Sequence, residues 1–503
     1  MTSAIDQTIV VLYYTLLVIL SSYALHRIHL IRLGRRAAEE KESDFVASAF
    51  EWPTVTVQLP LYNEASVAIR LIRAVSRLEY AGGLSVQVLD DSTDETSQIV
   101  AAEVERLSSR GLEIVHIQRR DRTGFKAGAL AEGMDRATSN FFAVFDADFV
   151  PGHDFLIRTI PRFADEGIGM VQARWGHINR DDGWLTRLQA IYLDGHFGVE
   201  SYARFRGGRF FNFNGTAGVW RRQAIVDAGG WSADTVTEDL DLSYRAQMQG
   251  WRFVFQYEHE VCAELPGTLS TFHGQQHRWA KGSIQTARKL LGPILRDTLP
   301  WATKVEAFFH LTNNVAYLLT LVLALLLVPS VLIRMSLGWS TIILFDFVLF
   351  FLSTGSLVAF YTEGQRRVGR PRPTMAEIVS LVPFGIGLSV NNASAVLEGL
   401  LRRGGDFNRT PKRGDESDTV RLDKPPRLPL GEMLLAGFYL FAAASLIGSG
   451  IYLPLPFVGL FLSGYVAVSI GAIAERFRFR EAITEESLDL GCSSPISKLA
   501  RSS

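Results

Sequence analysis

The sequence contains little cysteine, no excess of either charge and no internal repeat. Its 503 residues include only two cysteines, Cys262 and Cys492, which are far apart and lack the spacing of metal ligands. We therefore expect neither a disulfide framework nor a zinc cluster, and this composition suits a cytosolic site. The formal net charge is −1, so overall charge does not indicate a protein that binds nucleic acid.

Apolar residues, in contrast, are abundant and gathered into long runs. They make up 48% of the chain, which is high for a soluble protein and low for one embedded in a membrane throughout. This composition favours a soluble domain joined to a membrane portion, and the length allows two or three domains.

Five of the runs predict helices that span a bilayer, although the fourth needs flanking residues to reach full length. They cover residues 8–25, 315–333, 342–361, 434–447 and 453–474. Basic clusters follow the first, third and fifth runs, so the positive-inside rule puts the N-terminus outside and those clusters in the cytosol. The first run could also be a cleaved signal peptide, but its basic residues follow it and no small-x-small cleavage site appears. We therefore favour a retained anchor.

A sixth apolar run, residues 378–400, differs from the others. It is interrupted by Pro383, two glycines and two asparagines, and it has basic residues on both sides. As a span it would put one basic flank outside, so we expect a helix that lies at the interface or re-enters. The tail from residue 485 on is rich in serine and small residues, which predicts disorder.

The segment between the first two spans, from about residue 53 to 269, predicts a soluble α/β domain. Strands are expected at 55–59, 86–89, 113–117, 141–145 and 169–172, alternating with helices. This alternation favours a mostly parallel sheet covered on both faces, with ligands beyond the carboxyl ends of its strands. Ser92 and Glu95 predict a capping box that begins the helix after the second strand.

Asp146 and Asp148 form an Asp-x-Asp pair directly after the strand at 141–145. Two carboxylates one residue apart at a strand end can hold a divalent cation on a diphosphate, and their hard oxygen ligands suit Mg²⁺ or Mn²⁺. No helix cap is in view after them, so a purely capping role is a weak alternative. We predict that these two residues bind a metal.

Polar residues also follow the first two strands. Tyr62 and Glu64 could stack on a base and bond to it, and Asp90 and Asp91 could accept hydrogen bonds from a base or a ribose. Each also has a structural alternative, because Glu64 suits a first helical turn and Asp91 with Ser92 could begin the next helix.

Lys126 and Asp239 each lie at the start of an expected helix. A cation beside the free amides of a helix N-terminus can bind an anion, with a solvated lysine as an equal alternative. Asp239 ends the triplet Thr237-Glu238-Asp239, and sugar transfer with inversion needs a carboxylate that takes the proton from the acceptor hydroxyl. In isolation, such an acid would more simply be a helix N-terminal carboxylate favoured by the dipole.

Gln275, Arg278 and Trp279 have the spacing of one helical face. They combine an amide that can bond hydroxyls, a cation that can bind a phosphate and an aromatic ring that can stack on a sugar. The alternative is an interfacial helix whose arginine and tryptophan anchor it at lipid headgroups.

Taken in order, these motifs resemble those of processive family 2 glycosyltransferases of the GT-A fold, the cellulose, mannan and hyaluronan synthases. Longer runs are similar to the plant cellulose-synthase-like A and C proteins. The runs cover residues 88–94, 126–130, 171–175, 215–220 and 275–279, and the resemblance extends over nearly the whole chain.

The resemblance implies a role for each position. It places the general base at Asp239, the metal and diphosphate at Asp146 and Asp148, the diphosphate also at Arg278, and the acceptor sugar on Trp279. Tyr62, Glu64, Asp91, Lys126 and Gln275 complete the expected substrate pocket. The segment 184–202 is similar to the interfacial helix of the family.

The resemblance also implies a gating loop. Residues 407–412 resemble the loop that closes over the bound nucleotide in cellulose synthases, and Thr410 and Lys412 match it. Arg409 departs from the family valine, and Pro411 stiffens the loop.

We therefore expect an α/β GT-A (Rossmann-like) cytosolic domain joined to an all-α transmembrane region. The expected units are an anchor (1–36), the glycosyltransferase domain (50–270), interfacial helices (271–301), two transmembrane helices (302–362), an interfacial or re-entrant helix with the gating loop (373–427), two further transmembrane helices (428–475) and a cytosolic tail (476–503).

The expected function is a metal-dependent, inverting β-glycosyltransferase of the plasma (inner) membrane. It would polymerise a β-1,4-linked glucan or mannan from UDP-glucose or GDP-mannose, and pass the polysaccharide through its own helices. Asn313, Asn314, Asn391 and Asn392 could line that path or bond helix to helix. The alternative is a non-processive enzyme that adds one sugar to a lipid. An inactive transporter or scaffold is less favoured, because none of the five motifs is broken.

Overall fold

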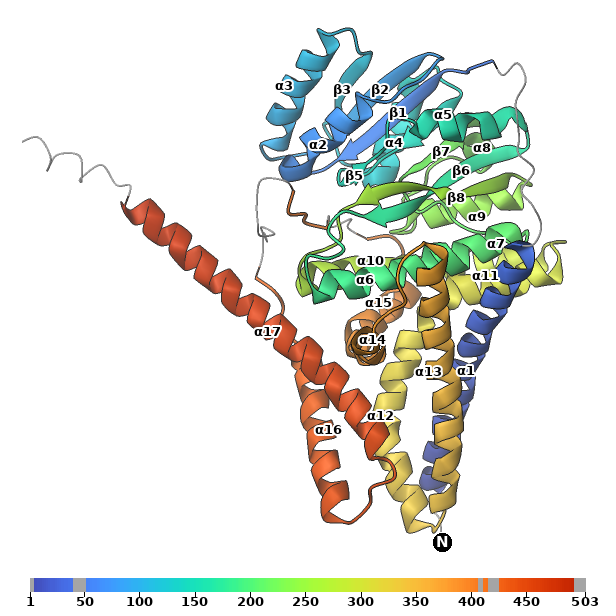
Figure 1. Ribbon diagram of the computed structural model, residues 1–503, viewed down its shortest axis with the longest axis vertical. Helices are drawn as coiled ribbons and strands as arrows, with labels where there is room; N and C mark the ends of the chain where they lie inside the picture. Colours follow the sequence, from blue (N-terminus) through green and yellow to red (C-terminus); the bar gives the residue numbers. More distant parts are fainter. Residues whose placement is uncertain (1–3, 39–50, 406–409, 415–424, 493–503) are drawn as a thin grey trace, which may run out of the picture.

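The computed structural model describes residues 4–38, 51–405, 410–414 and 425–492. An α/β domain lies at one end of the molecule and a group of long helices at the other, with further helices running between them (Figure 1). This arrangement matches the expected soluble domain joined to an all-helical membrane portion.

A mixed eight-stranded sheet forms the α/β domain, with strand order β3-β2-β1-β4-β7-β6-β8-β5. The strands β1 to β4 pair in parallel in the order 3-2-1-4, whereas β7 is antiparallel to both of its neighbours. The strands are β1 (Val55–Leu61), β2 (Leu84–Asp90), β3 (Ile114–Gln118), β4 (Phe141–Val144), β5 (Phe149–Val150), β6 (Ile168–His177), β7 (Gly218–Arg221) and β8 (Arg252–Ala263).

Helices cover both faces of this sheet because successive strand residues point to opposite sides. On one face Val55, Val57 and Leu59 pack with the apolar residues of α2, α3 and α5. On the other, Phe142 and Val144 pack with those of α4, α8 and α9. These helices are α2 (Ala65–Val75), α3 (Thr96–Ser108), α4 (Phe125–Arg136), α5 (Phe155–Thr159), α8 (Arg222–Asp227) and α9 (Glu238–Met248), and the 3₁₀ helix η1 (Ile160–Ala164) follows α5.

A layer of helices separates the α/β domain from the long helices (Figure 1). It contains α6 (Trp184–Gly195), the π-helical turn η2 (His196–Ser201), α7 (Tyr202–Arg206), α10 (Leu269–Arg296) and α11 (Trp301–Thr312). The predicted interfacial helix at 184–202 corresponds to α6 and η2. The Gln-x-x-Arg-Trp residues lie on α10, so they do share a helical face.

Within the described residues, five helices are long and apolar enough to cross a membrane, judged by length and composition: Ala4–Arg36, Val315–Ser336, Ile343–Arg367, Leu430–Gly448 and Leu455–Glu481. They belong to α1 (Ala4–Ala38), α12 (Val315–Ser336), α13 (Ile343–Arg367), α16 (Leu430–Gly448) and α17 (Leu455–Cys492), with η3 (Ser340–Ile342) before α13. All five predicted spans coincide with these helices. The sixth run forms α14 (Met375–Gly387) and α15 (Ser389–Leu401), bent by 45° as in a broken span or a re-entrant segment.

The structure differs from the sequence predictions at three places. The capping box at Ser92 and Glu95 is wrong, because α3 begins at Thr96 and Asp94 Oδ1 accepts the hydrogen bond from Thr96 N. Strands β5, β7 and β8 were not expected, and the antiparallel pairing comes from β7 with both of its neighbours and from β5 with β8. Helix α17 continues to Cys492, so the predicted disorder is wrong for residues 485–492.

Candidate active site and the adjoining cavity

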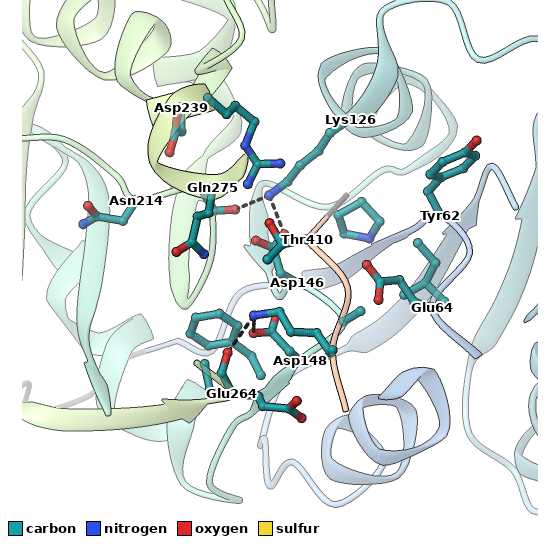
Figure 2. A pocket seen from close by; sticks show the side chains of 18 of the residues that line it. Tyr62, Glu64, Lys126, Asp146, Asp148, Asn214, Asp239, Glu264, Gln275 and Thr410 are labelled. Carbon is teal, nitrogen blue, oxygen red and sulfur yellow. Dashed lines mark hydrogen bonds and ion pairs between the residues drawn. The ribbon is translucent and has the colours of Figure 1, made fainter. Parts of the chain in front are cut away.

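The twelve residues to which the family resemblance assigns a role all line one pocket of about 150 Å³. The pocket lies beyond the carboxyl ends of β1, β2 and β4, and it is closed by α9, α10 and the segment 410–414 (Figure 2). The lining residues are Tyr62, Glu64, Asp91, Lys126, Asp146, Asp148, Asp239, Gln275, Arg278, Trp279, Thr410 and Lys412.

A tight turn places the residues that follow β1. Asn63 adopts a left-handed conformation with φ of 55°, which asparagine tolerates better than most residues. Its side-chain Oδ1 accepts a hydrogen bond from Thr93 N, and its backbone N donates to Ser92 Oγ. These bonds tie the ends of β1 and β2 together. The guanidinium of Arg122 lies 3.3 Å from the centre of the Tyr62 ring and covers one of its faces.

The two adjacent aspartates after β2 have different surroundings. Asp90 is 1% exposed, and its carboxylate is bound by His116, Ser92 N and Ser97. The prediction that Asp90 binds a base or ribose is therefore wrong, because its side chain points into the domain. Asp91 does line the pocket, and both of its oxygens are bound by Arg119, at 2.7 and 2.5 Å.

Lys126 is not the solvated lysine of the alternative interpretation. Its side chain is 10% exposed, and its ammonium group forms an ion pair with Asp146 and donates to the carbonyl of Gly215. Burial alone would lower the pKa of Lys126, but the charges of Asp146 and Glu238 more than offset it, so the pKa is raised. The group is a fixed cation inside the pocket.

The described part of the predicted gating loop is residues 410–412, and together with residues 413 and 414 it closes one side of the pocket. Lys412 Nζ lies 2.6 Å from Asp148 Oδ2 and donates to the carbonyl of Glu264 at 2.6 Å. The carboxylate of Glu264 accepts hydrogen bonds from the backbone N–H groups of Arg413 and Gly414. Residues Phe407–Arg409 of the predicted loop lie outside the described residues.

Asp239 lies in the first turn of α9, and it lines the same pocket as Asp146 and Asp148, which follow β4. Burial and the neighbouring charge of Glu238 raise the pKa of Asp239 to about 7. Gly215 leaves room for it, because a Cβ there would come within 3.1 Å of Asp239 Oδ2 and 3.4 Å of Lys126 Nζ. A carboxyl group with a raised pKa that stays near neutrality suits a general base.

Helix α10 brings the remaining groups to the pocket. Gln275, Arg278 and Trp279 all face it, and the same helix packs on Thr237 through Gly282. Burial lowers the pKa of Arg278, while Glu238 and Asp146 act in the opposite direction. The pocket therefore contains two buried cations, Lys126 and Arg278, among several acids.

The donor set fits a divalent cation held jointly with a substrate. Asp146 and Asp148 supply hard oxygen ligands, as Mg²⁺ and Mn²⁺ prefer. Within the described part of the chain, no group of three or more His, Cys, Asp or Glu side chains could hold a metal ion. An ion bound here would need ligands from a phosphate group, which is the usual pattern for Mg²⁺ with one or two carboxylates.

A second, larger cavity of about 520 Å³ adjoins the pocket on its membrane side. Asn214, Thr237, Asp239, Gln275 and Trp279 line both spaces. The cavity's lining extends between the long helices to Tyr13 of α1 and Asp346 in the first turn of α13.

The four asparagines proposed for a membrane path divide into two pairs. Asn313 and Asn314 line the cavity. Asn391 and Asn392 are not among its lining residues, and Asn391 Nδ2 donates to the carbonyl of His273 on α10. The alternative of helix-to-helix bonding therefore describes Asn391.

Several pocket residues were missed by the sequence analysis: Arg122, His177, Asn214 and Glu264. Glu264 directly follows β8, and an acid at a strand end would have been a signal had β8 been predicted. Asn214 immediately precedes the run at 215–220. His177 ends β6, and no sequence signal distinguishes it.

Comparison with known proteins agrees with the site. A family model described as "Glycosyltransferase like family 2" matches residues 53–282. Glucomannan 4-beta-mannosyltransferase 7 of Arabidopsis thaliana is 32% identical over 453 residues, which cover 85% of this chain and 79% of that relative. Glucomannan 4-beta-mannosyltransferase 1 of Oryza sativa subsp. japonica is 41% identical over 301 residues, which cover 58% of this chain and 57% of that relative, a little over half its length.

Among solved structures, a mannosyltransferase from Pyrobaculum calidifontis in complex with GDP-Man and Mn²⁺ has a TM-score of 0.49 at 19% identity, covering 78% of this chain and 99% of that one. A likeness of this size is too weak to place a ligand or a side chain. The similarity to the sequence relatives is high enough to show the family. It agrees with the ordered motifs, the α/β domain and the apolar helices. The chain belongs to the family 2 glycosyltransferases, in the group that contains the plant glucomannan 4-beta-mannosyltransferases.

Proposed function

We propose that this protein is a membrane-embedded, metal-dependent, inverting β-glycosyltransferase that extends a β-1,4-linked mannan or glucan. One observation carries the proposal: Asp239 and Trp279 line both the pocket of acids and cations and the cavity between the long helices. A base and a sugar-stacking ring at this junction can serve a donor on one side and a growing chain on the other.

In the proposed reaction, Asp239 takes the proton from the acceptor 4-hydroxyl. The hydroxyl oxygen attacks the anomeric carbon of the donor on the face opposite the diphosphate, the carbon–diphosphate bond breaks, and the nucleoside diphosphate leaves with the bonding electrons. Attack from the opposite face inverts an α-linked donor to a β-linked product. Lys126 and Arg278 lie where they can stabilise the negative charge of the leaving group. Mg²⁺ or Mn²⁺, held by Asp146 and Asp148, would neutralise part of the same charge.

The donor is GDP-mannose or UDP-glucose, and we place GDP-mannose first. The relatives are named glucomannan 4-beta-mannosyltransferases, and this supports mannose as a transferred sugar. Tyr62, Glu64 and Asp91 are the residues that we assign to the nucleotide, with Arg122 stacked on Tyr62.

We further propose that the polysaccharide leaves through the cavity, with Trp279 at its entrance and the segment 410–414 gating the donor side. The gate is supported by the contacts of Lys412 to Asp148 and Glu264. The protein would act in the plasma (inner) membrane with its catalytic domain in the cytosol. Its partners would be the nucleotide sugar, the polysaccharide and the bilayer, and no nucleic acid.

The test is transfer by the purified protein in lipid nanodiscs. GDP-mannose and UDP-glucose are supplied separately with Mn²⁺, Mg²⁺ or EDTA, and the linkage and length of any product are determined. We expect β-1,4-linked chains of several sugars, made only with a divalent cation. Asp239→Asn should abolish transfer and leave nucleotide binding within about threefold of wild type. Near-normal transfer by Asp239→Asn would remove Asp239 as the base, and a product with only one added sugar would contradict polymerisation.

A further inference from the structure

The helical layer changes from α- to π-helical geometry at η2, between α6 and α7. Single π-helical turns within helices are rare and occur often at functional sites. Here the turn carries His196 and Glu200, and both residues line the cavity next to the active site.

His196 and Glu200 form a pair whose protons can be assigned from their neighbours. His196 Nδ1 lies 3.0 Å from Glu200 Oε2, and His196 Nε2 lies 3.1 Å from Asn214 Oδ1. Asn212 Nδ2 donates to the carbonyl of Phe213 at 2.9 Å and to Asn214 Oδ1 at 3.1 Å. A carbonyl can only accept, so this contact orients the Asn212 amide, and Asn214 must present its oxygen to both Asn212 and His196.

It follows that His196 Nε2 is a donor. Burial alone would raise the pKa of Glu200, but the charge of Arg204 and the hydrogen bond from His196 hold it well below its usual range. Glu200 is therefore a carboxylate, and His196 Nδ1 lies within hydrogen-bond distance of it. The His196–Glu200 pair is fixed at one wall of the cavity.

A purely structural role suits the residues behind this pair better than it suits the pair itself. Arg204 bonds to Glu306 at 2.8 Å and contacts Glu200 at 3.5 Å, and Glu306 pairs with His26 of α1 at 2.9 Å. The side chains of Arg204 and Glu306 are each 3% exposed, whereas those of Glu200 and His196 are 18% and 26% exposed. Within this network, Glu200 and His196 are the members that line the cavity. Among the described residues, no hydrogen bond reaches Glu200 Oε1.

The position of the pair relative to the reaction is set by Asn214. This residue lines both the catalytic pocket and the cavity, and it directly precedes Gly215, which lies against Asp239 and Lys126. Figure 2 shows the Asn214 side chain on the far side of Gln275 from Tyr62 and Glu64. A ligand at His196, Glu200 and Asn214 would therefore lie beyond the reacting sugar, toward the membrane.

We propose that Glu200 and Asn214, positioned by His196, form an acceptor subsite that binds the hydroxyl groups of a hexopyranose unit one or more places behind the sugar stacked on Trp279. A carboxylate oxygen without a protein partner can accept a bond from a sugar hydroxyl, and bonds to charged groups are among the stronger ones. This inference rests on the proposed function, because it needs an acceptor chain in the cavity.

The experiment measures acceptor binding without turnover. Wild-type protein in nanodiscs, with GDP and Mn²⁺, is titrated calorimetrically with mannotetraose and with cellotetraose. We expect Glu200→Gln to weaken binding of the preferred tetrasaccharide by about 10- to 100-fold, the range for one lost bond to a charged group. The affinity for GDP should stay within about twofold, which shows that the variant is folded.

His26→Gln is the matched control, because His26 belongs to the same ion network through Glu306 but is not among the residues lining the cavity. We expect it to bind the tetrasaccharide within about twofold of wild type. His196→Gln, which removes the ring that contacts and positions Glu200, should weaken tetrasaccharide binding and raise the acceptor KM more than it lowers kcat.

The subsite is overturned if Glu200→Gln binds the tetrasaccharide as wild type does, if His26→Gln weakens binding as much as Glu200→Gln, or if wild type binds neither tetrasaccharide. These results are separate from the proposed function. A wild-type protein that transfers sugar while Glu200→Gln binds normally would refute the subsite alone. A wild-type protein that binds the tetrasaccharide but transfers no sugar from any donor would refute the function alone.

Discussion

The contact between α10 and the start of α9 offers a sharp test of how the site is positioned. Gly282 of α10 packs directly on Thr237, which precedes α9 and lies two residues before Asp239. A Cβ at Gly282 would lie 2.5 Å from Thr237 Oγ1 and closer still to its Cγ2. Gly282→Ala therefore forces α10 away from the start of α9, which carries the proposed base Asp239.

The size of the effect follows from these distances. Carbon atoms pack best at about 3.5–4.0 Å, so Thr237 or α10 must move by about 1 Å. Overpacking of this kind costs about 1–3 kcal/mol, and the better helix propensity of alanine returns up to about 1 kcal/mol. The net loss of stability is then about 0–3 kcal/mol. A displacement of about 1 Å in a catalytic group can lower the rate about 100-fold, so a Gly282→Ala protein that remains folded should still lose most of its activity.

The control is Gly274→Ala on the same helix. A Cβ there meets nothing within 4 Å, so this variant should keep wild-type transfer and gain up to about 1 kcal/mol in stability. The assay compares kcat for sugar transfer with the thermal unfolding temperature of each variant in nanodiscs. Adding Thr237→Ala to Gly282→Ala removes the two closest contacts and should recover part of the lost rate.

The reasoning would be refuted by a Gly282→Ala enzyme with kcat within about threefold of wild type. It would also be refuted if Gly274→Ala lost as much activity, because the effect would then belong to helix flexibility and not to the contact with Thr237.

Three further predictions concern the pocket. Trp279→Ala should reduce chain extension at least tenfold more than hydrolysis of the donor, because we assign the ring to the acceptor sugar; equal losses in the two reactions would make Trp279 structural. Since Asp239 must be deprotonated to take a proton and its pKa is raised to about 7, kcat/KM should rise about tenfold from pH 6 to a plateau above pH 8, and a flat profile would contradict its role. Lys412→Ala removes the ammonium bound to Asp148, so Mn²⁺ should bind about tenfold more tightly without nucleotide, measured by electron paramagnetic resonance of the free ion; an unchanged affinity would argue that Asp148 does not hold the metal.

Much of the site could be predicted from the sequence because its residues lie at the ends of strands and the starts of helices. Asp91, Asp146 and Asp148 come directly after buried strands, and parallel strands bring their carboxyl ends to one edge of a sheet. The spacing of Gln275, Arg278 and Trp279 predicts one face of a helix, and α10 presents all three to the pocket.

The missed features depend on partners distant in the sequence. Asp90 and Asp91 look equivalent in the chain, yet His116 on the neighbouring strand holds Asp90 inside while Arg119 holds Asp91 at the pocket. Strand β7 has only four residues and pairs antiparallel with β4 and β6, so neither its existence nor its direction has a local signal. The assignment of Glu264 to the site depends on β8, which was not predicted, and on the backbone N–H groups of Arg413 and Gly414 that bind its carboxylate.

Hydrophobic periodicity and strand-end chemistry are local properties, so the sequence alone predicted the apolar spans, most strands of the α/β domain and the ordered set of acids. Which of those groups lie in one pocket depends on how the chain folds. The tertiary structure joined Lys126 to Asp146 and Lys412 to Asp148, and it opened the cavity that runs from Trp279 toward Asp346. Such pairings depend on packing between separate segments, 20 residues apart for Lys126 and Asp146 and far more for Lys412 and Asp148, and a linear pattern cannot encode the distance between them.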